Sequence, residues 1–177
     1  MQTSIFEIAI HEINGWRIGH LPTAISTRLP SRGLCLADAA IHDHHVKLVL
    51  EPDGRGSHWF RVDDELAQKL AIDVGDTVKI QLTPTKDWPE PNVPADIQAA
   101  LEGDPDAYEL WNDVTPMARW DWIRWIVSTH NPTTREKRIH VTLDKLHKGT
   151  RRPCCFNRAM CCEPHVSKGG VLLQSDN

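Results

Sequence analysis

The stretch Thr115–Lys148, TPMARWDWIRWIVSTHNPTTREKRIHVTLDKLHK, decides the fold of the C-terminal half of the chain. Thr115 followed by Pro116 is typical of a helix start, because Thr can cap and the N–H that Pro lacks has no partner there. Apolar side chains, three tryptophans among them, then occupy two sides of the helical wheel. That pattern is typical of a helix contacted by several neighbours in a bundle. We therefore predict that the tryptophans pack in a core. An exposed aromatic platform that stacks bases or a ligand is the alternative.

A second helix is predicted to start at Asn131-Pro132 and to stop at Gly149. Its apolar residues recur at i, i+4 and i+7 and form one stripe: Ile139, Leu143 and Leu146. Basic residues surround the stripe. They could form a solvated face that pairs with acidic neighbours, or they could contact phosphates. The candidate contacts for nucleic acid or another anion, which include two residues beyond the helix, are Arg135, Arg138, Arg151 and Arg152.

Charge is distributed unevenly along the chain. The net charge of −4 divides into −3 over residues 1–83, −7 over residues 84–113 and +6 over residues 114–177. The simplest interpretation is internal, with acidic helices packed beside basic ones. The alternative is a basic C-terminal surface for an anionic partner. A sequence pI near 6.2 does not favour a strong nucleic-acid binder.

The helical region resembles a known family. The resemblance rests on a Pro-x-x-Ile-x-x-Ala-Leu opening, a Trp-rich helix that ends in Trp-Ile, and a Thr-Arg-x-x-Arg-Ile segment. The residues that carry it are Pro94, Ile97, Ala100, Leu101, Trp125, Ile126, Thr134, Arg135, Arg138 and Ile139. These motifs are similar to the helical domain of the YdeI/OmpD-associated family. The family name implies association with an outer-membrane porin or protection against bacteriocins.

The N-terminal half alternates short apolar runs with turn signals. Strands are predicted over residues 4–13, 34–41, 46–51, 57–62 and 77–82, with short helices over residues 22–29 and 63–70. Asn14-Gly15 is the clearest turn signal. Several short strands separated by turns favour a small barrel. This order is also similar to the domain of unknown function found before the YdeI/OmpD-associated domain, and that resemblance implies a split β-barrel. The residues that carry it include Trp16, Arg32-Gly33, His58 and Gly75-Asp76.

The predicted fold class is therefore α+β, with a small N-terminal split β-barrel followed by a C-terminal helical bundle. Four prolines in eleven positions predict an extended linker, because each Pro lacks an N–H and restricts its predecessor. The expected domains are the barrel over residues 1–83, the linker over 84–93, the helical domain over 94–149 and a Cys-rich tail over 150–177. We expect Trp88 to anchor the linker against one domain and the tail to fray after Gly169.

The tail supplies the candidate metal ligands Cys154, Cys155, Cys161, Cys162 and His165. Thiolates and imidazole are the donors that a structural zinc site uses, and a loop-rich tail would gain folding energy from one. Adjacent cysteines point in different directions, however, and the spacing is not the usual C-x2-4-C. A thiol redox switch activated by nearby arginines, or simply free thiols, are the alternatives.

Two loops are weaker candidates. His42, His44 and His45 lie at a predicted turn and could bind a metal, although such clusters are common in surface loops. Asp53, Arg55 and His58 surround a Gly-containing turn that could bind an anion through backbone N–H groups. Ordinary turn chemistry is the simpler interpretation. No P-loop, dinucleotide fingerprint or nucleophile elbow is present.

The sequence leads to three hypotheses for function. The first is a non-enzymatic interaction or stress-protection protein with an unknown protein partner. The others are a nucleic-acid-binding module and a thiol redox switch. No catalytic residue is predicted, and the only cofactor considered is zinc. No apolar run approaches the roughly 18 residues that span a bilayer, and no signal peptide is evident, so we expect a cytoplasmic protein.

Overall fold

The computed structural model describes residues 2–154, 156–162 and 169–174. These residues form two compact units. The described residues up to 87, together with 158–161 and 169–174, make the first unit, and residues 88–154, 156–157 and 162 make the second. The chain therefore leaves the first unit, builds the second, and returns to the first.

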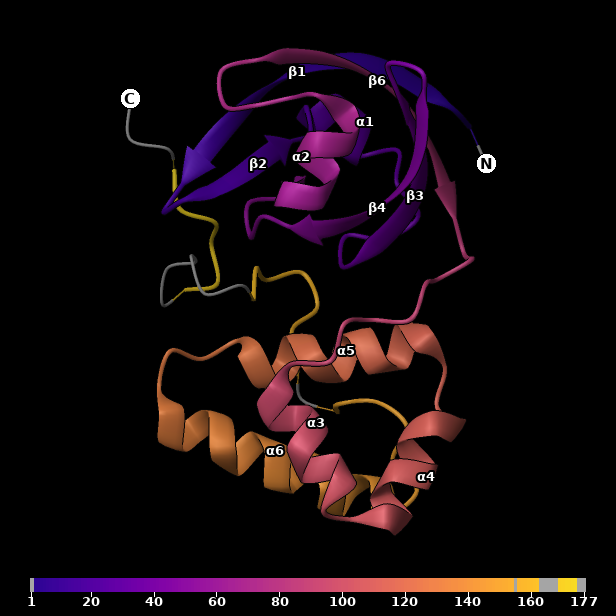
Figure 1. The fold of residues 1–177 in the computed structure, drawn as a ribbon, viewed down its shortest axis with the longest axis vertical. Helices are drawn as coiled ribbons and strands as arrows, with labels where there is room; N and C mark the ends of the chain where they lie inside the picture. The colour runs from indigo at the N-terminus through magenta and orange to yellow at the C-terminus, as the bar shows by residue number, and fades with distance from the viewer. Residues whose placement is uncertain (1, 155, 163–168, 175–177) are drawn as a thin grey trace. The chain divides into compact units, whose positions relative to one another are not determined.

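The first unit is a six-stranded antiparallel barrel that closes in the order β1-β2-β5-β4-β3-β6 (Figure 1). Its strands are β1 (Ser4–Ile13), β2 (Trp16–His20), β3 (Cys35–Ile41), β4 (His44–Pro52), β5 (His58–Val62) and β6 (Thr77–Thr85). Two short helices, α1 (Thr23–Ser26) and α2 (Asp64–Leu70), lie in the connections. The predicted α+β layout, a barrel followed by helices, is confirmed. β6 runs three residues further than the predicted strand and pairs Pro84 with Ala37.

The hairpin of β1 and β2 turns at Asn14-Gly15. Both residues have positive φ, 49° and 81°, as a two-residue hairpin turn with the favoured twist requires. The turn sets the register, so that Ile13 pairs with Trp16 and His11 pairs with Ile18. The turn was predicted from sequence, but the strand that follows it was not.

The barrel core is apolar and closely filled. Gly19 on β2 lies opposite Phe60 on β5, and Phe60 is almost fully buried. A Cβ added at Gly19 would lie 2.3 Å from Cζ of the Phe60 ring. Glycine is therefore required here because the ring occupies the space of a side chain, and the backbone conformation plays no part.

Gly19→Ala is expected to lower the free energy of unfolding of the barrel by about 2 kcal/mol, since overpacked cores typically lose 1–3 kcal/mol. Phe60→Leu alone should also destabilise. In the double variant the smaller side chain makes room for the methyl group, so the two losses should not add. Hydrogen exchange of barrel amides in all four proteins measures the coupling. Additive losses would show that the methyl group added at position 19 and the Phe60 ring do not compete for the same space.

The second unit is formed by four helices: α3 (Ala95–Glu102), α4 (Pro105–Asp113), α5 (Pro116–Val127) and α6 (Pro132–His147). The predicted caps are present. The Thr115 hydroxyl accepts from the Ala118 N–H at 3.3 Å, and the Asn131 side chain accepts from the Thr134 N–H at 3.1 Å. Gly149 follows α6 with φ 75°. These local signals explain why the starts of α5 and α6 and the end of α6 were predicted within a residue or two.

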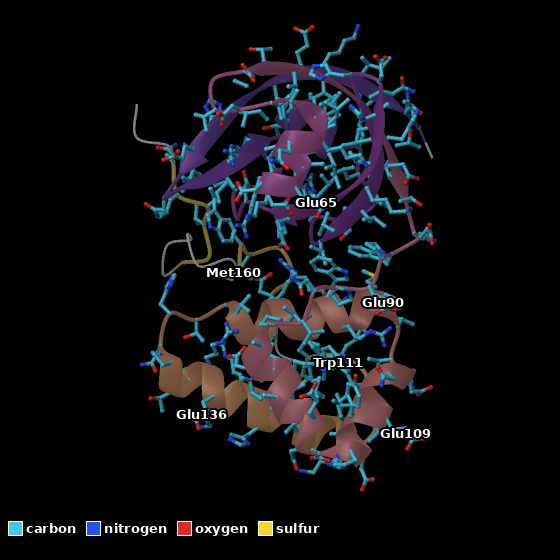
Figure 2. All side chains as sticks on the ribbon, in the orientation of Figure 1. Glu65, Glu90, Glu109, Trp111, Glu136 and Met160 are labelled. Atoms are coloured by element: carbon cyan, nitrogen blue, oxygen red, sulfur yellow. The ribbon has the colours of Figure 1, made fainter. Side chains whose placement is uncertain are left out.

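Two tryptophans of the second unit are buried, and the other three are partly buried. Trp111 and Trp122 are buried, and Figure 2 shows Trp111 among the helices. The Trp122 and Trp125 rings meet edge to face with centroids 5.8 Å apart. The ring centroids of Trp88 and Trp120 are 6.3 Å apart, so Trp88 anchors the linker on α5 as expected. The core interpretation is confirmed for Trp122, and the exposed platform is wrong for it.

A buried arginine joins three parts of the second unit. The Arg119 guanidinium donates to the carbonyls of Trp111, Asn112 and Val114, at the end of α4, over 2.6–3.1 Å. Its other edge binds both carboxylate oxygens of Glu90 in the linker, at 2.7 and 2.9 Å. A cation at the C-terminal end of a helix also interacts favourably with the helix dipole. Arg119 thus fixes α4, α5 and the linker to one another.

Candidate functional site

The outer face of the β1–β2 hairpin carries an unusual mixture of side chains. Because side chains alternate along a strand, His11 and Ile13 on β1 share one face with Ile18 and His20 on β2. This face lies opposite the barrel core. Ile13 and Ile18 are nevertheless buried, because they belong to a second apolar cluster with Trp59, Cys161 and Leu172. Something other than the barrel strands must therefore cover them.

Residues 169–174, called the C-terminal segment below, provide that cover. The Leu172 N–H donates to the Asp53 carbonyl at 2.8 Å, and Arg55 Nη2 donates to the Leu172 carbonyl at 2.8 Å. The Cys161 N–H donates to the Gly170 carbonyl at 2.7 Å. Fraying after Gly169 was expected from sequence, and that prediction is wrong for Gly170 and Leu172. The segment stays in place because Leu172 is buried and its backbone polar groups are bonded.

Gly54 makes this close approach of two backbones possible. It has φ 76°, and a Cβ built on it would lie 2.2 Å from the Gly170 carbonyl oxygen. Both the backbone conformation and the missing side chain are therefore needed. The Gly54 turn joins β4 to β5, so the barrel itself presents the surface on which the C-terminal segment lies.

Asp53 organises the turn between β4 and β5. One carboxylate oxygen, Oδ1, accepts the backbone N–H groups of Arg55 at 2.7 Å and Ser57 at 2.9 Å. The other, Oδ2, lies 2.9 Å from His20 Nε2. Burial acts to raise the pKa of Asp53, but the hydrogen bonds from Arg55, His20 and Ser57 together outweigh it and lower the pKa. Asp53 is therefore an ionised carboxylate, and His20 Nε2 carries the hydrogen of their bond.

These elements enclose a cavity of about 360 Å³. Its lining residues come from β1, β2, the β4–β5 turn and the C-terminal segment: His11, Ile13, Ile18, His20, Asp53, Arg55, Leu172, Leu173 and Gln174. The volume falls in the range of small-molecule sites, and aliphatic walls with a few converging polar groups are typical of them. Among the lining residues that the structure describes, none is Ser, Thr or Cys, so these residues offer no hydroxyl or thiol nucleophile.

The predicted metal ligands are placed as follows. Cys161 is buried in the first unit, where its Sγ accepts from Trp59 Nε1 at 3.3 Å. Cys162 is buried in the second unit, and Cys154 is exposed. Cys155 and His165 lie outside the described residues. Within the described ranges no group of three or more His, Cys, Asp or Glu side chains could hold a metal ion. The tail zinc site therefore stays a prediction.

The four candidate anion contacts all have partners inside the second unit. Arg135 forms a two-bond ion pair with Asp96 at 2.6 and 2.9 Å. Arg138 donates to the Trp125 carbonyl and the Ser128 hydroxyl. Arg151 binds Asp113 at 2.7 Å. Arg152 lies 4.0 Å from the buried Asp121. Three of these partners are carboxylates, as the internal interpretation of the charge distribution expects.

The two weaker loop candidates have local explanations. The N–H groups of Arg55 and Ser57 are bonded to Asp53, so the turn uses its own carboxylate in place of an external anion. His58 is buried between the Ser26 hydroxyl, at 2.7 Å, and the Gly33 carbonyl, at 2.8 Å. His42 has φ 51° at the hairpin turn and contacts the Leu70 carbonyl. Turn chemistry is therefore confirmed for Asp53.

The pocket was not predicted from sequence, although the sequence does contain a signal for the wall formed by β1 and β2. The Asn14-Gly15 turn fixes the hairpin register, and the register alone places His11 opposite Ile18. Two histidines and two isoleucines on one outward face could have been read as a partly covered surface. The other wall depends on Leu172, more than a hundred residues away, and no local pattern indicates where that segment lies.

Comparison with known families agrees with both halves of this architecture. Residues 3–82 match the model of a domain of unknown function, DUF1905. Residues 90–149 match the model of the family described as bacteriocin-protection, YdeI or OmpD-associated. No curated protein matches the chain. In the part of the chain that the structure describes, no helix combines the length and apolarity needed to cross a bilayer. The chain is thus similar, in this order, to DUF1905 over its barrel and to the YdeI/OmpD-associated family over its helices, and each match spans less than half of the chain.

Proposed function

We propose that this protein acts by binding and not by catalysis, as an interaction or stress-protection protein of the YdeI/OmpD-associated type, with a small-molecule site on its barrel. The carrying observation is the cavity on the outer face of β1 and β2, which aliphatic side chains line together with the His20–Asp53 pair. The names of the matching family support an interaction role. The proposed compartment is the cytoplasm, and the proposed macromolecular partner is a protein.

A binding role fits the chemistry of the lining better than catalysis does. An imidazole held by a carboxylate can act as a general base, but the described lining residues supply no hydroxyl or thiol for it to activate. Asp53 uses both oxygens to hold the turn and His20. A nucleic-acid-binding module and a thiol redox switch are the alternatives. The internal partners of the four arginines and the burial of Cys161 and Cys162 favour neither.

A blocking substitution tests the site. His11 is exposed on β1, and His11→Trp would place an indole across the cavity at a strand position where tryptophan is well tolerated. His45→Trp is the matched control, because His45 is exposed on β4 and lies outside the lining. Ligand-observed NMR against a panel of water-soluble acids, amines, amides and neutral ring compounds measures binding to each protein.

We expect some compounds of the panel to bind the wild type and the His45→Trp variant with similar affinity. The same compounds should bind His11→Trp at least about tenfold more weakly, because the indole fills their space. The proposal fails if no compound binds the wild type, or if His11→Trp binds every compound as well as the wild type does. Thermal unfolding of the three proteins checks that the substitutions leave the barrel folded.

A further inference from the structure

We propose that the ligand of this pocket is a compact monocarboxylate with a short aliphatic tail. The proposal rests on the proposed function and names the ligand class of the same site. It follows from three features of the lining: which hydrogen-bonding groups are already used, where a fixed positive charge lies, and what covers the rest of the wall.

The polar end of the pocket offers a fixed cation, whereas the one carboxylate among its described residues is already occupied. Asp53 is the one carboxylate among the described lining residues, and its oxygens already accept from Arg55 N–H, Ser57 N–H and His20. Because it is buried and its pKa is lowered, it remains an occupied acceptor. A ligand ammonium group would therefore find no free carboxylate in this lining.

Arg55 supplies the fixed cation. Within the described residues its guanidinium makes one hydrogen bond, from Nη2 to the Leu172 carbonyl at 2.8 Å. That bond orients the group, and a guanidinium carries four further N–H donors. A planar guanidinium matches the two oxygens of a carboxylate, and such charge-assisted bonds are roughly twice as strong as neutral ones. The imidazoles of His11 and His20 also belong to the lining.

The remaining wall is aliphatic and small. Ile13, Ile18, Leu172 and Leu173 line it, and the cavity of about 360 Å³ corresponds to about a dozen water molecules at roughly 30 Å³ each. A ligand of about eight to twelve non-hydrogen atoms would fill this space. Inorganic phosphate would make no contact with the apolar wall, and a ligand without an anionic group would leave the Arg55 guanidinium without a charged partner.

Hexanoate is the probe, and hexanamide, hexylammonium and inorganic phosphate are its comparators. Each is titrated into the full-length ¹⁵N-labelled protein, and the backbone amides of residues 11–20, 55 and 172–174 report binding. Three variants accompany the wild type. Arg55→Gln removes the cation, and His11→Trp blocks the cavity. Arg32→Gln is the matched control, because Arg32 donates to the Gly56 carbonyl of the same turn but lies outside the lining.

We expect hexanoate to bind the wild type and Arg32→Gln with a Kd on the order of 1 mM, as a ligand of eight heavy atoms should. Arg55→Gln should weaken it at least about tenfold, and hexanamide and hexylammonium should bind at least about tenfold more weakly than hexanoate. Binding of hexanamide or hexylammonium as tight as that of hexanoate, lost in His11→Trp, would overturn the carboxylate class and leave the binding function standing. Absence of site-specific shifts with all four probes would also overturn the class, and the wider panel then decides the binding function separately.

Discussion

Arg119→Met is expected to lower the free energy of unfolding of the helical unit by about 3–5 kcal/mol. The carbonyls of Trp111 and Val114 would each lose a charged donor in a buried place, and a hydrogen bond to a charged group is worth about 1.5–3 kcal/mol. The ion pair with Glu90 adds little, because that carboxylate is 66% exposed. Arg119→Lys should recover only a small part, since an ammonium cannot reach both the carbonyls and Glu90.

Hydrogen exchange of the α4 and α5 amides measures this loss within the unit concerned, and the barrel amides serve as an internal reference. Arg135→Met is the matched control. It removes an arginine from the same unit, but its ion pair with Asp96 is at the surface and should contribute less than about 1 kcal/mol. Equal losses in the two variants would contradict the role assigned to Arg119.

Asp53→Ala is expected to destabilise the barrel unit by about 3 kcal/mol. The N–H groups of Arg55 and Ser57 would lose their acceptor, and an unsatisfied buried group costs about 1–3 kcal/mol. His20 would lose its partner, and the turn that carries Leu172 would loosen. Asp38→Ala is the control, because Asp38 is a half-exposed carboxylate paired with Lys47 and should cost less than about 1 kcal/mol. A loss in Asp53→Ala no larger than that of the control would remove Asp53 as the organiser of the turn.

Asp53 should also make the stability of the barrel unit depend on pH. The pKa of Asp53 is lowered in the folded protein from the ordinary value of 3.8, so the unfolded chain binds the proton more readily. Its contribution to stability is therefore complete above pH 3.8 and is lost as the pH falls through the lowered value. Asp53→Asn keeps an acceptor for the two N–H groups but has no carboxylate to ionise, so it should be less stable than the wild type at pH 7, and the difference should shrink as the pH falls. Denaturation of both proteins between pH 2 and pH 7 measures the difference.

The two longest helices, α5 and α6, could be predicted from sequence, because their signals are local. Thr115-Pro116 and Asn131-Pro132 each combine a capping side chain with a first-turn proline, and the bonds of both caps are present. The barrel was predicted as a class of fold, since alternation and turns reveal strands. Strand β2 was missed because it contains Gly19, whose place is explained only by Phe60 across the sheet.

The candidate site was harder to predict because it is assembled from distant parts of the chain. Asp53 was noticed for its turn, but its contact with His20 depends on how β2 and β5 pair. The roles of the charged residues in the helical unit were also hard to predict. The arginines were considered as anion contacts because they are numerous and close in sequence, whereas pairing with Asp96 and Asp113 is visible only once the helices are packed. Residue type alone could not distinguish these outcomes.

The return of the chain to the barrel also bears on its synthesis. The ribosome completes the last barrel strand at Thr85, then makes the helical unit, and only afterwards adds Leu172, which covers Ile13 and Ile18. Domains generally fold as units while the chain emerges. A nascent barrel would therefore show its apolar outer face throughout translation of the helices, and would be open to chaperones during that interval. The cavity itself would form last, so an interrupted chain would carry a barrel without the Leu172 wall of that cavity.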